Sequence, residues 1–216
     1  MRIAILGAGR MGAGLGGLWA RLGHDVTFAY ARDPDRLARR ARDAGADAAP
    51  VAEAVDGAEA VLLAVHWSRV EDVLDQAGDL AGRVVLNCCV PLDATDSRIV
   101  TAPGTSGAEE LAARRPGARW VSAFNTCPSE SLAPVFARRD RAPRPQVLVC
   151  GDDAGARAVA HELARGIGYE PLDAGGLEAA RFVEPFAMVT ALLAYGQPGG
   201  PALTYRFDKL DGRTPS

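Results

Sequence analysis

The sequence predicts an α/β protein whose N-terminal part is a doubly wound parallel sheet, the Rossmann fold, followed by a small mixed C-terminal domain. The apolar run Arg2–Leu6 leads directly into the motif G-x-G-x-x-G at residues 7–12, the pattern of a strand, a tight turn and a helix. Short apolar runs then alternate with helical patterns, which is typical of strands buried on both faces. The alternation becomes irregular after Asn125. We therefore expect one domain over residues 1–125 and a smaller one over residues 126–216.

A dinucleotide site needs glycine at each of the three motif positions for a different physical reason. Gly7 permits the tight turn out of the strand, and Gly9 has no Cβ, so a pyrophosphate can approach its backbone. Gly12 lets the helix pack closely on the sheet. The helix that starts near Arg10 presents free N–H groups and the positive end of its dipole to a phosphate. The alternative is a glycine turn without a ligand, but the strand before it and the helix after it favour a dinucleotide site.

Caps and apolar runs mark the remaining elements. Gly23 and Gly45 are typical helix ends, and Asp33-Pro34 reads as an N-cap followed by proline at the first helical position. Pro185 predicts a kink or break in the last helix. Expected strands are 2–6, 25–30, 60–65, 84–89, 119–124, 146–150, 171–173 and 204–207. Expected helices are 11–22, 34–44, 51–55, 68–78, 105–114, 128–136, 154–167 and 177–195, and residues 211–216 are expected to fray.

Composition narrows the function classes. The chain has 216 residues, of which 48% are hydrophobic, and a formal charge of −3, so it can bury a core and offers no basic surface for nucleic acid. No apolar stretch is long enough to span a bilayer. The four cysteines lie outside metal-ligand spacing with the histidines, so we expect no metal site and free, mostly buried thiols at Cys88, Cys89 and Cys150. Since the motif stands at the first residues, we expect no signal peptide and a cytoplasmic protein.

The residues after the second strand indicate the cofactor. NAD sites usually place a carboxylate there, and NADP sites replace it with arginine, because a carboxylate would repel the 2′-phosphate. This strand ends in Tyr30-Ala31-Arg32, and Arg36 lies one helical turn further on. Asp33 precedes a proline and is better placed to cap the helix than to bind ribose. The sequence therefore predicts NADP(H).

Beyond the fingerprint, the chain resembles the NADP oxidoreductase family that depends on coenzyme F420. The matching segments follow the family's order and cover nearly the whole chain. They are residues 3–9, 63–67, 104–111, 123–126, 150–153, 172–175, 179–181 and 184–185. The resemblance implies NADP on the Rossmann part, a deazaflavin in a cleft closed by the smaller domain, and a homodimer. The chain departs from the family at His66, where proline is common, and at Val90, where asparagine precedes Pro-Leu.

The expected site residues fall into three groups. Hydride transfer requires two rings held close together in a dry cleft and needs neither a nucleophile nor a metal. For cofactor binding we expect Gly7, Ala8, Gly9, Arg10, Met11, Gly12, Ala31, Arg32, Arg36, Ala64, Val65, His66, Cys88 and Val90. For the substrate we expect Trp67, Pro91, Asn125, Thr126, Phe186 and Met188. His66 and Asn125 are the catalytic candidates.

Several of these residues have a structural role as the alternative to the functional one. His66 either donates a proton or hydrogen bond to the acceptor or holds the loop after its strand. Trp67 covers a ring face or packs in the core. Phe186 and Met188 line the pocket or contribute to core or dimer packing.

Three functions follow from these patterns. The first is hydride transfer between NADP(H) and coenzyme F420. The second is NADPH-dependent reduction of a small metabolite, such as an imine or an unsaturated intermediate, and the third is a redox sensor that binds NADP(H) without turnover. The expected partners are a small-molecule acceptor and a second copy of the chain, with no nucleic acid and no membrane. Helix 177–195 is long and apolar, so we expect it to contribute to the dimer interface.

Overall fold

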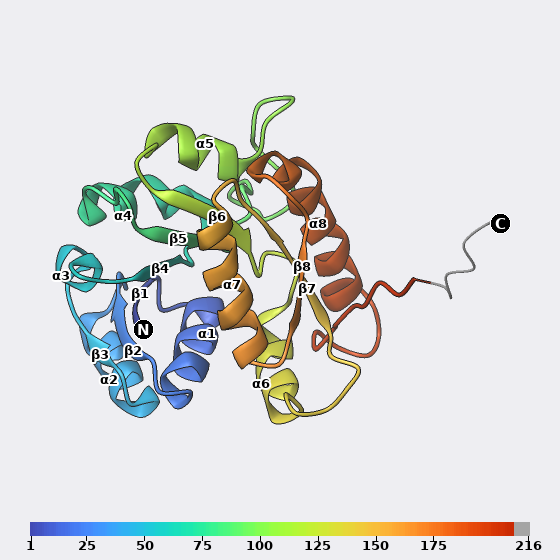
Figure 1. Ribbon diagram of the computed structural model, residues 1–216, viewed down its shortest axis with the longest axis horizontal. Helices are drawn as coiled ribbons and strands as arrows, with labels where there is room; N and C mark the ends of the chain where they lie inside the picture. Colours follow the sequence, from blue (N-terminus) through green and yellow to red (C-terminus); the bar gives the residue numbers. More distant parts are fainter. Residues whose placement is uncertain (210–216) are drawn as a thin grey trace.

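The computed structural model describes residues 1–209, and these form one eight-stranded sheet with helices on both faces (Figure 1). The strand order is β3-β2-β1-β4-β5-β6-β7-β8. Strands β1 to β6 are parallel, β7 is antiparallel to β6, and β8 is parallel to β7. The strands are β1 Arg2–Leu6, β2 Asp25–Ala29, β3 Asp47–Ala48, β4 Ala60–Leu63, β5 Val84–Asn87, β6 Arg119–Ala123, β7 Gln146–Cys150 and β8 Glu170–Asp173. The predicted doubly wound Rossmann sheet is confirmed.

The helices divide into two layers. Side chains of α1, α2, α6 and α7 pack on one face of the sheet, and those of α3, α4 and α5 pack on the other. The α-helices are α1 Arg10–Arg21, α2 Pro34–Ala44, α3 Val51–Val55, α4 Val70–Ala77, α5 Gly107–Arg114, α6 Ser129–Ala137, α7 Ala154–Gly166 and α8 Ala180–Gly196. Two 3₁₀ turns, η1 Trp67–Arg69 and η2 Leu177–Ala179, precede α4 and α8. The helix α8 lies at the opposite end of the sheet from α2 and α3 (Figure 1).

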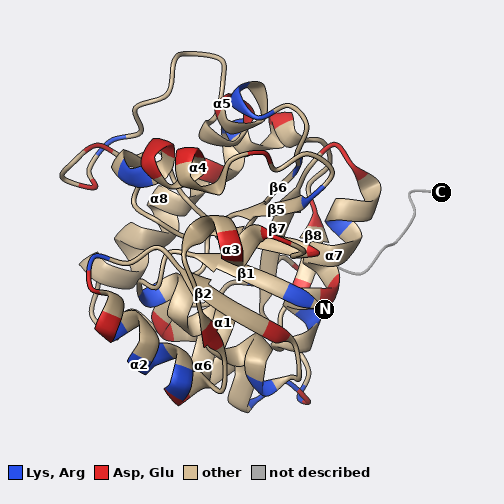
Figure 2. Ribbon diagram, turned by 90° about the vertical axis from the view of Figure 1, so that its left-hand side faces the viewer, with Lys and Arg blue, Asp and Glu red and all other residues tan. Residues whose placement is uncertain are grey.

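The interior of the sheet explains the apolar runs in the sequence. Strands β4 and β5 are fully buried, as expected for central strands of a sheet covered on both faces. Figure 2 shows the middle of the sheet in tan, with charged residues on helices, loops and strand ends. Cys89, Cys127 and Cys150 are buried free thiols, and Cys88 is half-buried. Within residues 1–209 no helix is both long enough and apolar enough to cross a bilayer.

Two expectations about the C-terminal part are wrong. Residues 204–207 are not a strand, because the segment makes one backbone bond to β7, from the Gln146 N–H to the Tyr205 carbonyl (2.9 Å), and otherwise bonds through side chains. The break predicted at Pro185 is absent, since α8 runs continuously from Ala180 to Gly196 with the proline exposed, and a kink there stays a prediction. The predicted fraying of residues 211–216 lies outside the described part of the chain. The division at residue 125 stays a prediction, and β7 and β8 extend the same sheet.

A buried carboxylate joins the C-terminal helix to the rest of the fold. Glu184 of α8 is 1% exposed and accepts hydrogen bonds from the Gly107 and Ala108 N–H groups at 2.9 and 3.0 Å, at the start of α5. Burial raises the pKa of Glu184 from 4.5 to about 7, although the two N–H donors favour the carboxylate. The charges of Glu109 and Glu110 raise this pKa further.

We predict that Gly12→Ala lowers the free energy of unfolding by about 1–3 kcal/mol, because its Cβ would collide with the Gly7 carbonyl. The matched control is Gly17→Ala in the same helix, whose Cβ would meet only the Ala44 Cβ at 3.9 Å. We expect this control to raise stability by about 0.5–1 kcal/mol through higher helix propensity. Denaturant unfolding of both variants measures the difference, and equal effects would contradict the close contact between strand and helix.

Glu184 predicts a pH-dependent stability. A carboxyl group whose folded pKa is raised contributes stability that is present below about pH 4.5 and is lost as the pH rises through about 7. The loss is on the order of 3 kcal/mol if it is fully expressed. Glu184→Gln should flatten the fall in unfolding free energy between pH 5 and 7.5, measured by denaturant unfolding at about five pH values. The exposed neighbour Glu178→Gln is the control and should keep the wild-type slope.

Candidate functional site

The glycine turn between β1 and α1 has the shape that a pyrophosphate requires. Gly7 has φ +112°, and a Cβ there would collide with the Ala64 carbonyl. A Cβ on Gly9, in contrast, would meet nothing within 4 Å. Gly9 is the N-cap of α1 and no side chain caps that helix, so the N–H groups of its first turn are available to a ligand. The open backbone at Gly9 thus fits a dinucleotide phosphate.

Beside this turn, a cavity of about 410 Å³ collects positive charge at the expected adenosine end. Its walls include five arginines, which are Arg10, Arg32, Arg36, Arg40 and Arg69. The expected residues Gly7, Ala8, Gly9, Arg10, Ala31, Arg32, Arg36, Ala64, Val65 and His66 all line it. Blue segments on α2 mark part of this charge in Figure 2. Guanidinium groups bind phosphate through paired N–H donors, so the cavity fits the additional phosphate of NADP.

Asp33 also lines this cavity, and its carboxylate caps α2. Its Oδ1 accepts a hydrogen bond from the Arg36 backbone N–H at 3.0 Å, the N-cap contact of α2. The cap predicted from the Asp33-Pro34 pair is therefore confirmed.

Two further arginines of the cavity, Arg40 and Arg69, were not predicted from the sequence as cofactor residues. Arg40 donates from Nη1 to the Ala8 carbonyl of the glycine turn. Arg69 donates from Nε to the Tyr30 hydroxyl at 3.0 Å, and that hydroxyl donates to Asp72 Oδ2 at 2.5 Å. Arg40 lies one turn beyond Arg36 on α2, so the helical spacing was a usable signal. The contact of Arg69 with Tyr30 spans 39 residues and left no signal in the sequence.

A second cavity of about 460 Å³, the redox cleft, opens at the other end of the turn between Gly9 and α8. The expected residues that line it are Gly9, Arg10, Met11, Ala64, Val65, His66, Trp67, Cys88, Val90 and Asn125. The Asn125 amide is fixed on both sides, since its nitrogen donates to the Cys89 carbonyl at 2.9 Å and its oxygen accepts from Ser122 Oγ at 3.0 Å. The cleft therefore joins the ends of β1, β4, β5 and β6 to α8.

Other expected residues lie outside the lining of both cavities. Gly12 packs under the turn against Gly7, and Pro91 is buried beside Gly107. Thr126 bonds the Tyr205 hydroxyl at 2.7 Å, and Phe186 packs edge-on against the Tyr205 ring, with ring centroids 5.3 Å apart. Met188 is half-buried on α8. In their place α8 presents Ala187, Thr190, Ala191 and Tyr195 to the redox cleft.

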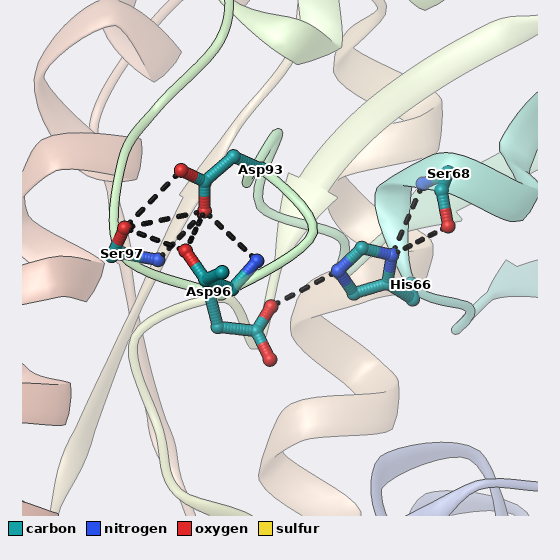
Figure 3. Close-up of polar contacts among 6 residues, drawn as sticks. His66, Ser68, Asp93, Asp96 and Ser97 are labelled. Carbon is teal, nitrogen blue, oxygen red and sulfur yellow. Dashed lines mark hydrogen bonds and ion pairs between the residues drawn. The ribbon is translucent and has the colours of Figure 1, made fainter.

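His66 is held by both ring nitrogens (Figure 3). Its Nδ1 accepts from the Ser68 backbone N–H at 3.2 Å and lies 2.8 Å from Ser68 Oγ. In the neutral ring the proton therefore sits on Nε2, which donates to Asp96 Oδ1 at 3.0 Å. His66 thus lines the redox cleft with its Nε2–H engaged by Asp96, and it ties down the loop that carries Asp96.

Asp93 shapes the loop that delivers Asp96. Its carboxylate accepts a hydrogen bond from the Ser97 backbone N–H at 2.9 Å (Figure 3). It also accepts one from the Thr95 backbone N–H at 3.2 Å. The Ser97 N–H, followed by the other donors, holds the pKa of Asp93 well below its usual range. Asp96 itself has a φ of +56°. The turn thus places a carboxylate 30 residues from His66 in the sequence against the imidazole.

The cysteines of the redox cleft are not nucleophiles at neutral pH. Burial raises the pKa of Cys89 and of Cys127 to about 12, so both remain thiols. Within residues 1–209 no group of three or more His, Cys, Asp or Glu side chains is arranged to hold a metal ion. The groups gathered in the cleft suit the positioning of flat rings better than thiolate chemistry.

Comparisons with known proteins agree with this geometry. Residues 2–91 match the family described as NADP oxidoreductase coenzyme F420-dependent, which confirms the resemblance expected from the sequence. A solved structure from Arthrobacter sp. FB24, described as a candidate F420-dependent NADP reductase, is 27% identical. It has a TM-score of 0.84, with 97% of this chain and 100% of that one covered.

Two other relatives mark the breadth of the match. The metalloreductase STEAP3 of Rattus norvegicus is 32% identical over 151 residues, which are 67% of this chain and 29% of that protein, so this chain spans less than a third of it. A reductive aminase from Aspergillus terreus, solved in complex with NADPH, shares the fold, with 18% identity, a TM-score of 0.65 and 89% of this chain and 61% of that one covered. The family match covers the N-terminal part of the chain, and these solved structures share its fold.

The arginine cavity predicts a preference for NADPH over NADH. Arg32→Ala should weaken NADPH binding by at least about tenfold, because a charge-assisted bond to the 2′-phosphate contributes about 1.5–3 kcal/mol. NADH binding should stay close to its wild-type value. The control is Arg39→Ala, an exposed arginine of α2 outside the cavity. Quenching of intrinsic tryptophan fluorescence on titration measures both affinities, and equal losses for the two cofactors would contradict the role of Arg32.

Proposed function

We propose that this chain transfers hydride between NADP(H) and the deazaflavin coenzyme F420. The observation that carries the proposal is the redox cleft, which begins at Gly9 of the cofactor turn and ends on α8. A dinucleotide lying along the turn from the arginine cavity would bring its nicotinamide end into this cleft. The family match over residues 2–91 and the relative from Arthrobacter support F420 as the acceptor.

The residues of the cleft have distinct proposed tasks. The apolar walls Val65, Trp67 and Val90 exclude water and hold two flat rings in contact, which is the main requirement of hydride transfer. Asn125 offers a fixed amide to the polar edge of a ring. Reduction of the acceptor by NADPH takes up one hydride and one proton. His66 in its imidazolium form donates that proton from Nε2 once this N–H exchanges Asp96 for the acceptor, and the neutral imidazole that remains is protonated again by solvent.

The test is anaerobic mixing of the protein with NADPH and oxidised coenzyme F420, followed by the loss of deazaflavin absorbance. We expect catalytic bleaching that is much slower with NADH. His66→Gln should lower kcat by at least about tenfold, because glutamine can replace the hydrogen bond but cannot donate a proton. Ser68→Ala, which removes only the hydroxyl beside Nδ1, is the control and should have a small effect. An unchanged kcat in His66→Gln would show that His66 does not donate the proton and only holds the loop of Asp96.

NADPH-dependent reduction of a small metabolite is the second candidate function. The N–H of His66 at the cleft mouth favours it, because reduction of an imine or carbonyl also consumes a proton. Tight NADPH binding without F420 bleaching, together with turnover of such an acceptor, would select this function. NADPH binding without turnover of any acceptor would instead identify a redox sensor.

We also propose that the protein is a homodimer through the outer face of α8. Large apolar side chains on this face are exposed, with Phe182 at 78% and Leu192 at 67%, accompanied by Val189 and Leu193. The opposite face of the same helix lines the redox cleft at Ala187 and Thr190, so a second copy on α8 would also stabilise the cleft.

Light scattering at micromolar concentration should give the mass of a dimer, since a patch of this kind rarely stays exposed. Leu192→Glu should shift the mass towards that of the monomer without unfolding, because the side chain faces solvent in the single chain. The control Leu22→Glu changes another exposed leucine, at the end of α1, and should leave the mass unchanged. A monomeric wild type would refute the interface.

A further inference from the structure

A third cavity lies on the same edge of the sheet as the redox cleft. Because β7 runs antiparallel to β6, the loop 138–145 that enters β7 lies at the edge where the parallel strands end. With residues 202–206 and part of α6, this loop encloses about 640 Å³. One wall is Tyr205, whose hydroxyl bonds Thr126 directly after β6 at 2.7 Å. The cavity is therefore a neighbour of the redox cleft, separated from it by the turn between β6 and α6.

The charge of this cavity is one-sided. Four arginines line it, Arg138, Arg141, Arg144 and Arg206, and no aspartate or glutamate does. Arg206 is paired with Glu170 at 2.9 Å and with Asp208 at 2.7 Å. Among residues 1–209 the other three arginines form no ion pair with a carboxylate. Since the whole chain carries a formal charge of −3, this local excess of cations runs against the overall balance.

We propose that this cavity, the arginine-loop site, binds a small organic anion that carries phosphate or carboxylate groups. Like charges that converge on one cavity repel one another, and a bound anion removes that repulsion. Guanidinium groups present paired donors that match phosphate and carboxylate oxygens. Apolar walls at Pro134, Val135 and Tyr205 favour an organic anion over a bare inorganic one. This proposal does not rest on the identity of the hydride acceptor.

Two kinds of molecule can supply the anion, and both carry the same phosphate or carboxylate groups. Because the cavity adjoins the redox cleft, the anion can be a charged extension of the molecule that receives the hydride. It can equally be a separate metabolite that binds beside the acceptor. Competition with the acceptor distinguishes the two.

The first experiment measures inorganic pyrophosphate and citrate binding by calorimetry at low ionic strength. The protein is first saturated with NADP⁺, so that the glycine turn and the cofactor arginines are already occupied. We expect the wild type to bind one anion, with an affinity that falls as salt is added. The triple variant Arg138→Gln/Arg141→Gln/Arg144→Gln should bind at least about tenfold more weakly.

Two controls keep this result interpretable. Arg165→Gln removes an exposed arginine of the last turn of α7 outside the cavity and should bind the anion like the wild type. The NADP⁺ affinity of the triple variant should equal that of the wild type, which shows that it is folded. Absence of anion binding by the wild type up to millimolar concentration, or equal binding by the triple variant, would overturn the proposal.

The second experiment identifies the source of the anion. It uses the turnover assay with whichever acceptor the protein reduces. If the anion is part of the acceptor, pyrophosphate competes with it, and the triple variant raises the acceptor KM while leaving kcat and the NADPH KM unchanged. If the anion is a separate metabolite, the acceptor KM is unaffected by the triple variant. Calorimetry decides whether the site binds an anion, and this second experiment only assigns the source of that anion. A wild type that turns over no acceptor would contradict the proposed function and leave the calorimetric test of the arginine-loop site intact.

Discussion

The close contact between β1 and α1 is the constraint on which the rest of the site depends. Only a residue without a Cβ fits at Gly12, which lies against the carbonyl of Gly7, and only glycine readily takes the φ of +112° at Gly7 beneath Ala64. These two positions bring the start of α1 directly over the end of β1. The uncapped N–H groups of α1 then face the open space beside Gly9, and the position of the phosphate site follows from this packing.

The parallel sheet brings the other functional groups to the same edge. Residues after β2 supply three of the five cavity arginines, Arg32, Arg36 and Arg40. Residues after β4 supply Arg69 and His66, and residues after β5 and β6 supply the loop of Asp96 and Asn125. The reversal at β7 extends this arrangement, because it returns the chain to the same edge at the arginine loop. Glu184 then ties α8 to α5 and holds the last wall of the cleft in place.

Much of this could be predicted from the sequence, because it depends on local patterns. The glycine spacing, the Asp33 cap and the apolar central strands each report a local physical requirement. The face of α8 could not be predicted, since both faces of that helix are apolar. Phe182 and Leu192 are exposed, whereas Val183 and Ala194 are buried, so the pattern does not show which residues reach the cleft.

Contacts between residues far apart in the chain could not be predicted from the sequence either. Asp96 meets His66 only because the Asp93 turn folds back over the cleft, and no periodic pattern encodes that approach. Tyr205 bonds Thr126 from an extended segment whose β-like composition predicted a strand. The segment is not a strand, because most of its hydrogen bonds to the sheet involve side chains.

The decisive experiment is a crystal structure of the complex with NADP⁺. We expect the 2′-phosphate among Arg32, Arg36 and Arg40, the pyrophosphate against the Gly9 backbone, and the nicotinamide ring in the redox cleft between Val90 and His66. A nicotinamide ring bound outside that cleft, or a 2′-phosphate turned away from the arginines, would contradict this expectation.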